Sequence, residues 1–69
     1  MIINWVDGFT IKVSMEGNNV LISANKEGLL SLANQLKTLA DEEIGAHSHY
    51  DEYNSLEEGS CEMIIEKIG

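Results

Sequence analysis

Hydrophobic and polar residues alternate through the first part of the chain. Every second residue from position 9 to position 15 is apolar: Phe9, Ile11, Val13 and Met15. This period of two is typical of a strand with one buried face. Asp7-Gly8, a favoured two-residue hairpin turn, connects that segment to an apolar stretch at 2–6, and Gly17-Asn18-Asn19 connects it to another at 20–24. Three antiparallel strands are therefore predicted before residue 25.

The next segment has helical spacing. Asn25 is a favourable N-cap, and Glu27 suits the positive end of a helix dipole. Apolar residues then recur three and four positions apart and define the leucine stripe: Leu29, Leu32, Ala33, Leu36, Leu39 and Ala40. We expect this stripe to pack on the sheet as core. Gly28 weakens the first turn by roughly 1 kcal/mol relative to Ala, which indicates that the helix crosses close to the sheet there.

Two further strands are predicted in the last third of the chain. Residues 47–53 alternate as one strand, and residues 60–68 form the last, in which Cys61 is a small core residue. The predicted order is βββαββ. The fold class is therefore α+β, with one small antiparallel sheet and one helix packed on one face. Residues 1–69 are predicted to be a single domain.

Composition narrows the class of protein. The 69 residues are 43% hydrophobic, which supports one small core and no second domain. No apolar run approaches the ~18 residues of a membrane-spanning helix, and Met1–Val6 lacks the length and the basic flank of a signal-peptide core. We therefore expect a cytoplasmic protein. Cys61 is the only cysteine, so an internal disulfide is excluded.

The charge is concentrated at one end of the sequence. Residues 1–40 carry three acids and three lysines, whereas residues 41–69 carry nine acids and one lysine, so the second segment holds the entire net charge of −8. Such a surface repels nucleic acid and anionic membranes and attracts basic partners. We expect a protein partner with a basic surface. Acidity that only maintains solubility is the alternative explanation.

Few residues suit metal binding or catalysis. His47 and His49 stand two apart on a predicted strand, where side chains ~6.5 Å apart can converge on one ion with Asp51 as a third ligand. An exposed histidine pair, or one bonded to nearby acids, fits the same spacing. No nucleophile elbow or glycine-rich phosphate loop accompanies Cys61 or the Glu57-Glu58 pair. We therefore expect no enzyme activity, no cofactor and no resident metal.

Residues 50–58 have a composition of their own. Two tyrosines are interleaved with four acids and one leucine. Tyrosine supplies contact area with one polar tip, and carboxylates accept bidentate hydrogen bonds from arginine. That mixture suits a patch that docks on a basic protein surface. A solvated strand end, with both tyrosines folded onto the edge of the core, is the alternative.

Two strings in the sequence carry a family resemblance. NKEGLLSLA at 25–33 and HSHYDEYNSLEEGSCEM at 47–63 resemble the signature of immunity protein family 32. These small bacterial proteins are encoded beside polymorphic or contact-dependent toxins. The strings hold 26 of the 69 residues and cover the helix start and nearly all of the C-terminal third. The resemblance implies an α+β domain that binds and neutralises a cognate toxin, and it brings no catalytic residues.

Three hypotheses follow from the residues and the resemblance. The first is a stoichiometric toxin inhibitor; a standard interface of ~800 Å² per partner is near a fifth of the ~4,300 Å² surface expected from size. Its predicted contacts are Glu42, Glu43, His47, His49, Tyr50, Asp51, Glu52, Tyr53, Asn54, Glu57 and Glu58. The second is a homo-oligomeric structural or regulatory module that pairs an apolar sheet edge at 1–6 or 64–68. The third is a histidine-based, metal-dependent binder.

Overall fold

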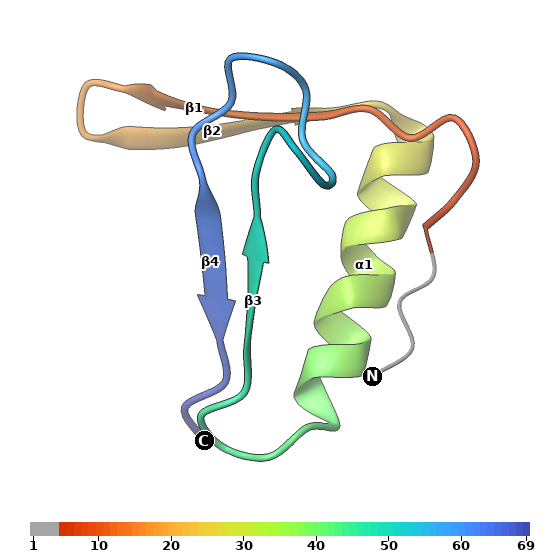
Figure 1. The fold of residues 1–69 in the computed structure, drawn as a ribbon, viewed down its shortest axis with the longest axis vertical. Helices are drawn as coiled ribbons and strands as arrows, with labels where there is room; N and C mark the ends of the chain where they lie inside the picture. Colours follow the sequence, from red (N-terminus) through yellow and green to blue (C-terminus); the bar gives the residue numbers. More distant parts are fainter. Residues whose placement is uncertain (1–4) are drawn as a thin grey trace.

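Two β-hairpins and one helix make up the fold. The computed structural model describes residues 5–69. In order, the elements are β1 (Ile11–Glu16), β2 (Asn19–Ala24), α1 (Lys26–Ala40), β3 (His47–Tyr50) and β4 (Met63–Glu66). Each hairpin is antiparallel: β1 pairs with β2, and β3 pairs with β4. Figure 1 shows the β1–β2 hairpin across the top, with α1 and the β3–β4 hairpin extending from it in the same direction.

The α+β class and the order of the elements agree with the prediction, but the expected single sheet is divided into two. The cause lies in the segment between β3 and β4. A strand was predicted to continue to Tyr53, but β3 ends at Tyr50. Asp51 and Asn54 bond to nearby backbone groups and turn the chain there. This segment then runs along the outer edge of β1, where its amides reach the carbonyls of Ile11 and Val13.

The predicted first strand at 2–6 lies largely outside the described residues. The turn that follows it is present. Gly8 has a φ of 83°, and the Phe9 amide donates to the carbonyl of Val6 at 3.1 Å. Asp7-Gly8 therefore turns the chain as the sequence predicts.

The N-terminus of α1 is positioned by its cap. The side-chain oxygen of Asn25 accepts from the amide of Gly28 at 2.7 Å and from the amide of Thr10 at 3.0 Å. A Cβ atom on Gly28 would collide with the carbonyl oxygen of Thr10. The predicted close crossing of helix and sheet at Gly28 is confirmed. One turn later, the hydroxyl of Ser31 accepts from the amide of Val6 at 2.8 Å.

The predicted packing of the leucine stripe holds only for Leu39, which is buried, and for Leu32, which packs against the core. The buried positions of α1 are Gly28, Ser31, Gln35 and Leu39, whereas Leu29 is 57% exposed and Leu36 is 49% exposed. The short side chains of Gly28 and Ser31 let the backbone before β1 lie directly against the helix. That contact turns most of the stripe away from the core, and only Leu39 of the stripe is fully buried.

The core lies where β1 meets β3 and the segment between β3 and β4. Its buried members are Ile11, Val13, Tyr50 and Leu56. Trp5 packs against this cluster, stacks on Phe9 at 4.8 Å between ring centroids and meets the ring of Tyr50 edge-on at 6.2 Å. Cys61 is exposed, so its predicted place in the core is wrong. None of the helices formed by residues 5–69 is long and apolar enough to cross a membrane.

Candidate protein interface

Residues 51–59 form a compact, internally bonded loop that we call the acidic loop. The carbonyl of Asp51 accepts hydrogen bonds from the amides of Asn54, Ser55 and Leu56 at 2.9–3.3 Å. Its carboxylate accepts from the amide of Tyr53 at 2.9 Å, and the side-chain oxygen of Asn54 accepts from the amide of Asp51 at 3.1 Å. These bonds within a few residues fix the shape of the loop.

The acidic loop is also attached to the core and to β1. Leu56 is 5% exposed and belongs to the core cluster. The amide of Glu57 donates to the carbonyl of Ile11 at 2.8 Å. Just beyond the loop, the hydroxyl of Ser60 accepts from the amide of Val13 at 3.1 Å. The outer edge of β1 is therefore closed by this segment.

The side chains that this backbone presents to solvent are mostly carboxylates. Glu52, Tyr53, Glu57 and Glu58 are all exposed, and Tyr53 is 91% exposed. Glu52, Tyr53 and Glu58 line one hollow of about 340 Å³. One carboxylate oxygen of Glu52 accepts from the amide of Gly59 at 3.0 Å, which holds that side chain in place. A hollow with one aromatic ring and two carboxylates suits a guanidinium or ammonium group.

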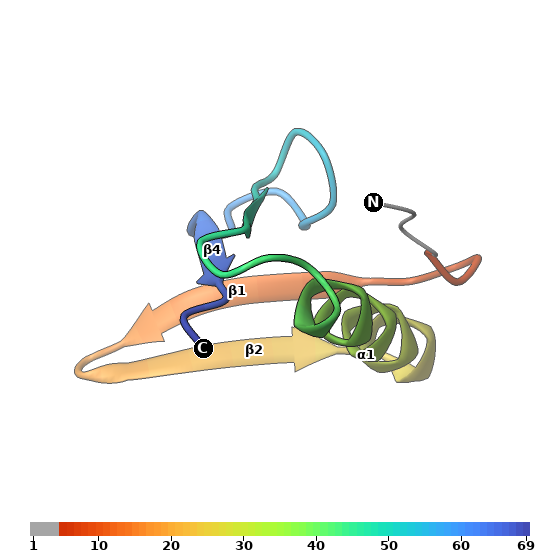
Figure 2. The ribbon, with the colours of Figure 1, turned by 90° about the horizontal axis from the view of Figure 1, so that it is seen from below.

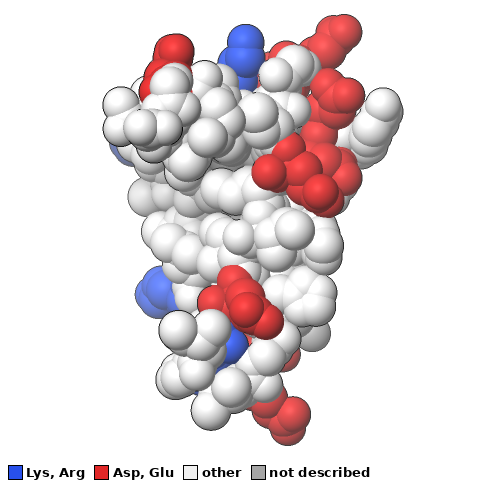
Figure 3. Space-filling view, turned by 90° about the vertical axis from the view of Figure 1, so that its left-hand side faces the viewer, with Lys and Arg blue, Asp and Glu red and all other residues white. Residues whose placement is uncertain are grey.

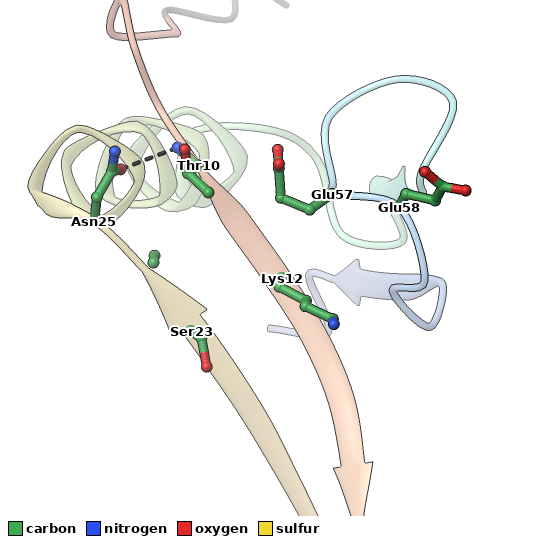
Figure 4. A pocket seen from close by; sticks show the side chains of 7 residues that line it. Thr10, Lys12, Ser23, Asn25, Glu57 and Glu58 are labelled. Carbon is green, nitrogen blue, oxygen red and sulfur yellow. Dashed lines mark hydrogen bonds between the residues drawn. The ribbon is translucent and has the colours of Figure 1, made fainter.

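A second, more open hollow lies between the acidic loop and the start of α1. It has a volume of about 570 Å³, and its lining includes Thr10, Lys12, Asn25, Glu57 and Glu58. Figure 4 shows Asn25 on one side, Glu57 and Glu58 on the other, and Lys12 rising from β1 between them. Sequence reasoning did not connect Lys12 and Asn25 with the acids, because they are more than thirty residues from them in the chain.

Three residues of the predicted contact set support the fold: Tyr50, Asp51 and Asn54. Tyr50 is 4% exposed and lies in the core, so its ring is not available at the surface. Asp51 and Asn54 form the bonds that shape the acidic loop. Asn54 also donates from its amide group to the carbonyl of His49 at 3.2 Å. Their contribution to any contact is therefore to hold the neighbouring carboxylates and Tyr53.

Glu42 and Glu43 lie apart from the acidic loop. They follow the C-terminus of α1, at the opposite end of the β3–β4 hairpin (Figure 1). Lys67 holds this end, because its ammonium donates to the carbonyls of Ala40 and Glu42 at 2.7 Å each. Figure 3 shows one dense group of acidic side chains at the upper right and further acids in the lower part, with an uncharged band between. On this face, the acids therefore do not form one continuous surface.

His47 and His49 lie side by side on the exposed face of β3. Their ring centroids are 5.1 Å apart. The Nδ1 atom of His49 lies 3.2 Å from a carboxylate oxygen of Glu62, and Nδ1 of His47 lies 3.3 Å from the carbonyl oxygen of Gly45. Among residues 5–69, no three histidine, cysteine or acidic side chains converge in a way that could hold a metal ion.

Tyrosine is enriched at protein–protein interfaces, and Tyr53 is exposed beside carboxylates on a fixed loop of this small α+β scaffold. The model of one protein family, immunity protein 32, matches residues 19–68. This span runs from β2 to the end of β4 and is well over half of the chain, so the chain belongs to the immunity protein 32 family. Membership of this family gives the chain the general role of an immunity protein. Comparisons with curated proteins and with solved structures find no match.

Proposed function

We propose that this immunity protein neutralises a cognate toxin by stoichiometric binding, with the acidic loop as the contact. The observation that carries the proposal is that the loop has a fixed backbone and exposed side chains. Hydrogen bonds from Asp51 and Asn54 and the burial of Leu56 hold the loop, whereas Glu52, Tyr53 and Glu58 face solvent around one hollow. A preorganised loop loses little conformational entropy when it binds.

The chemistry of the hollow defines the expected contact on the toxin. A guanidinium group can bond to a carboxylate while it stacks on a tyrosine ring, so we expect an arginine or lysine of the toxin between Tyr53 and Glu58. Glu57 extends the same charge toward the hollow beside Lys12. Glu42, Glu43, His47 and His49 would lie at the margin of a larger contact. The charge of Glu42 and Glu43 would act mainly on the rate of encounter.

The first test reverses one charge. The variant Glu58→Lys should bind the toxin domain encoded beside this protein at least ~10-fold more slowly, because attraction between opposite charges speeds association. The matched control is Glu16→Lys, which makes the same change at an exposed residue on the β1–β2 turn. Association rates measured at several salt concentrations, together with growth of toxin-producing cells, give the result.

The second test removes the aromatic contact. Tyr53→Ala should weaken binding by ~10-fold or more, since exposed tyrosines that become buried in a complex are frequent hot spots. It should leave thermal unfolding unchanged, because Tyr53 is 91% exposed. If Glu58→Lys and Tyr53→Ala both fold and protect cells as the unchanged protein does, the acidic loop is not the contact.

A further inference from the structure

The two strands of the first hairpin differ at their outer edges. The outer edge of β1 is bonded to residues 57–61. Within residues 5–69, no strand or loop is bonded to the outer edge of β2, which is the end strand of a two-stranded sheet. Figure 2 shows the β3–β4 hairpin and the acidic loop on the β1 side and no strand or loop beyond β2. An open edge is a template for pairing with another strand.

The backbone groups at this edge can be identified from the register. The amide of Asn25 donates to the carbonyl of Thr10, and bonded pairs alternate along an antiparallel hairpin. Since Ile11 is opposite Ala24 and Val13 is opposite Ile22, the N–H and C=O groups of Val20, Ile22 and Ala24 point outward. The carbonyls of Ile11 and Val13, which point outward from β1, are the ones that residues 57 and 61 reach.

β2 exposes apolar side chains on both of its faces. Val20 is 60% exposed, Leu21 43% and Ile22 42%. Val20 and Ile22 share a face with the buried Ile11 and Val13, because they lie opposite residues of the same alternation in β1. That face is therefore core-like but incompletely covered. Leu29 and Leu36 of α1, the helix that starts directly after β2, are exposed as well.

The charge distribution favours a second copy as the partner of this edge. Asn19–Ala24 carries no charge, and α1 carries Lys26, Glu27 and Lys37. The β2 edge is therefore a place where two chains of net charge −8 can approach without strong repulsion. A basic toxin, in contrast, finds its opposite charge on the acidic loop. A six-residue antiparallel strand is also self-complementary about a two-fold axis, which is the symmetry of most dimers.

We propose that two copies of the chain pair through β2 and form a continuous four-stranded antiparallel sheet. A two-fold axis at Ile22 places Val20 opposite Ala24 of the second copy and joins the outward N–H and C=O groups of both strands. The chain exposes 4795 Å², about 500 Å² more than the ~4,300 Å² expected for a compact chain of this mass. A standard interface covers ~800 Å² per partner, so the open strand alone would supply only part of such an interface.

The test is the mass of the purified full chain in the absence of toxin. Sedimentation equilibrium should give a concentration-dependent species of twice 7.6 kDa. Ile22→Lys should shift it to the monomer, because a lysine in an edge strand opposes pairing. Ile44→Lys and Ile64→Lys make the same change at exposed isoleucines away from β2, and both should remain dimeric. Ile64→Lys also tests pairing through the 64–68 edge.

Amide exchange of the unchanged protein keeps the proposal testable if Ile22→Lys does not fold. The amides of Val20 and Ile22 should become protected as concentration rises. A chain that is monomeric at all concentrations overturns the proposal, as does a dimer that Ile64→Lys dissociates and Ile22→Lys does not. If these amides are already protected in the monomer, a segment of the same chain pairs with the β2 edge. If they become protected only when toxin is added, the toxin pairs with it. Either result overturns self-pairing.

Discussion

The two outer edges of the β1–β2 hairpin have opposite surroundings. The edge of β1 is closed by the acidic loop and the residues after it, and the side chains beneath it, Ile11 and Val13, are completely or almost completely buried. The edge of β2 is open, and Val20 and Ile22 on the same face are largely exposed. The hairpin therefore has one edge whose backbone groups are bonded and one edge whose backbone groups are not, within residues 5–69. The segment that closes the β1 edge includes the acidic loop, which exposes Glu52, Glu57 and Glu58.

This difference separates stability from binding. Residues that hold the acidic loop on β1 contribute to folding, whereas residues that the loop exposes are the proposed contacts. Residues at the open edge contribute little to the folding of a single chain. The following substitutions test that separation, in order of expected effect.

The largest effect is expected from the residue that anchors the acidic loop in the core. Leu56→Ala should lower the free energy of unfolding by about 2–4 kcal/mol, since it removes a buried leucine and leaves a cavity. Leu21→Ala, the same change on the open strand, should cost less than about 0.5 kcal/mol in dilute solution. Urea unfolding of both variants at low concentration gives the comparison. Equal losses would mean that the two edges do not differ in burial.

A smaller effect is expected where α1 approaches β1. Gly28→Ala should destabilise the protein by about 1–3 kcal/mol, because the added Cβ meets the carbonyl of Thr10 and forces an adjustment of packed atoms. The intrinsic helix preference alone predicts the opposite sign by about 1 kcal/mol. Ala33→Gly on the exposed side of α1 measures that preference. Thermal unfolding that shows Gly28→Ala to be stabilising would contradict the close approach.

The smallest effect is expected from a single hydrogen bond at the closed edge. Ser60→Ala removes the acceptor of the Val13 amide and should cost about 1–2 kcal/mol, since a partly buried donor loses its partner. Ser23→Ala on the exposed surface of β2 should stay within about 0.5 kcal/mol of the unchanged protein. Hydrogen exchange should show faster exchange at the Val13 amide in Ser60→Ala only. Unchanged exchange at Val13 would show that Ser60 does not close this edge.

Local patterns predicted most of the elements. Alternation identified β1, Asn25 identified the start of α1, and Asp7-Gly8 identified a turn, because each depends on neighbouring residues alone. The end of β3 was missed, since the bonds of Asp51 and Asn54 to the backbone compete with strand pairing. The division into two sheets was missed because a loop at 57–61 occupies the edge of β1. The last strand was predicted to begin at residue 60, but it begins at Met63.

The buried face of α1 could not be predicted from hydrophobic spacing. Gly28 and Ser31 are buried because a backbone segment far along the chain lies against them, and periodicity contains no information about such a contact. The sequence of β2 contains an indication of its open edge that the prediction did not use. Val20, Leu21 and Ile22 are three consecutive apolar residues, which departs from the alternation of a strand with one wet face. For the contact set, composition indicated the acidic stretch, but only the structure separates Tyr53 from the buried Tyr50.

The way in which the acidic loop is held has an evolutionary consequence. Its backbone depends on Asp51, Asn54 and Leu56. The side chains of Glu57 and Glu58 are exposed and form no hydrogen bond with the rest of residues 5–69. Mutations at those glutamates can therefore accumulate without disturbing the fold. If the acidic loop is the contact, as proposed, its specificity can change through substitutions that leave each intermediate variant folded.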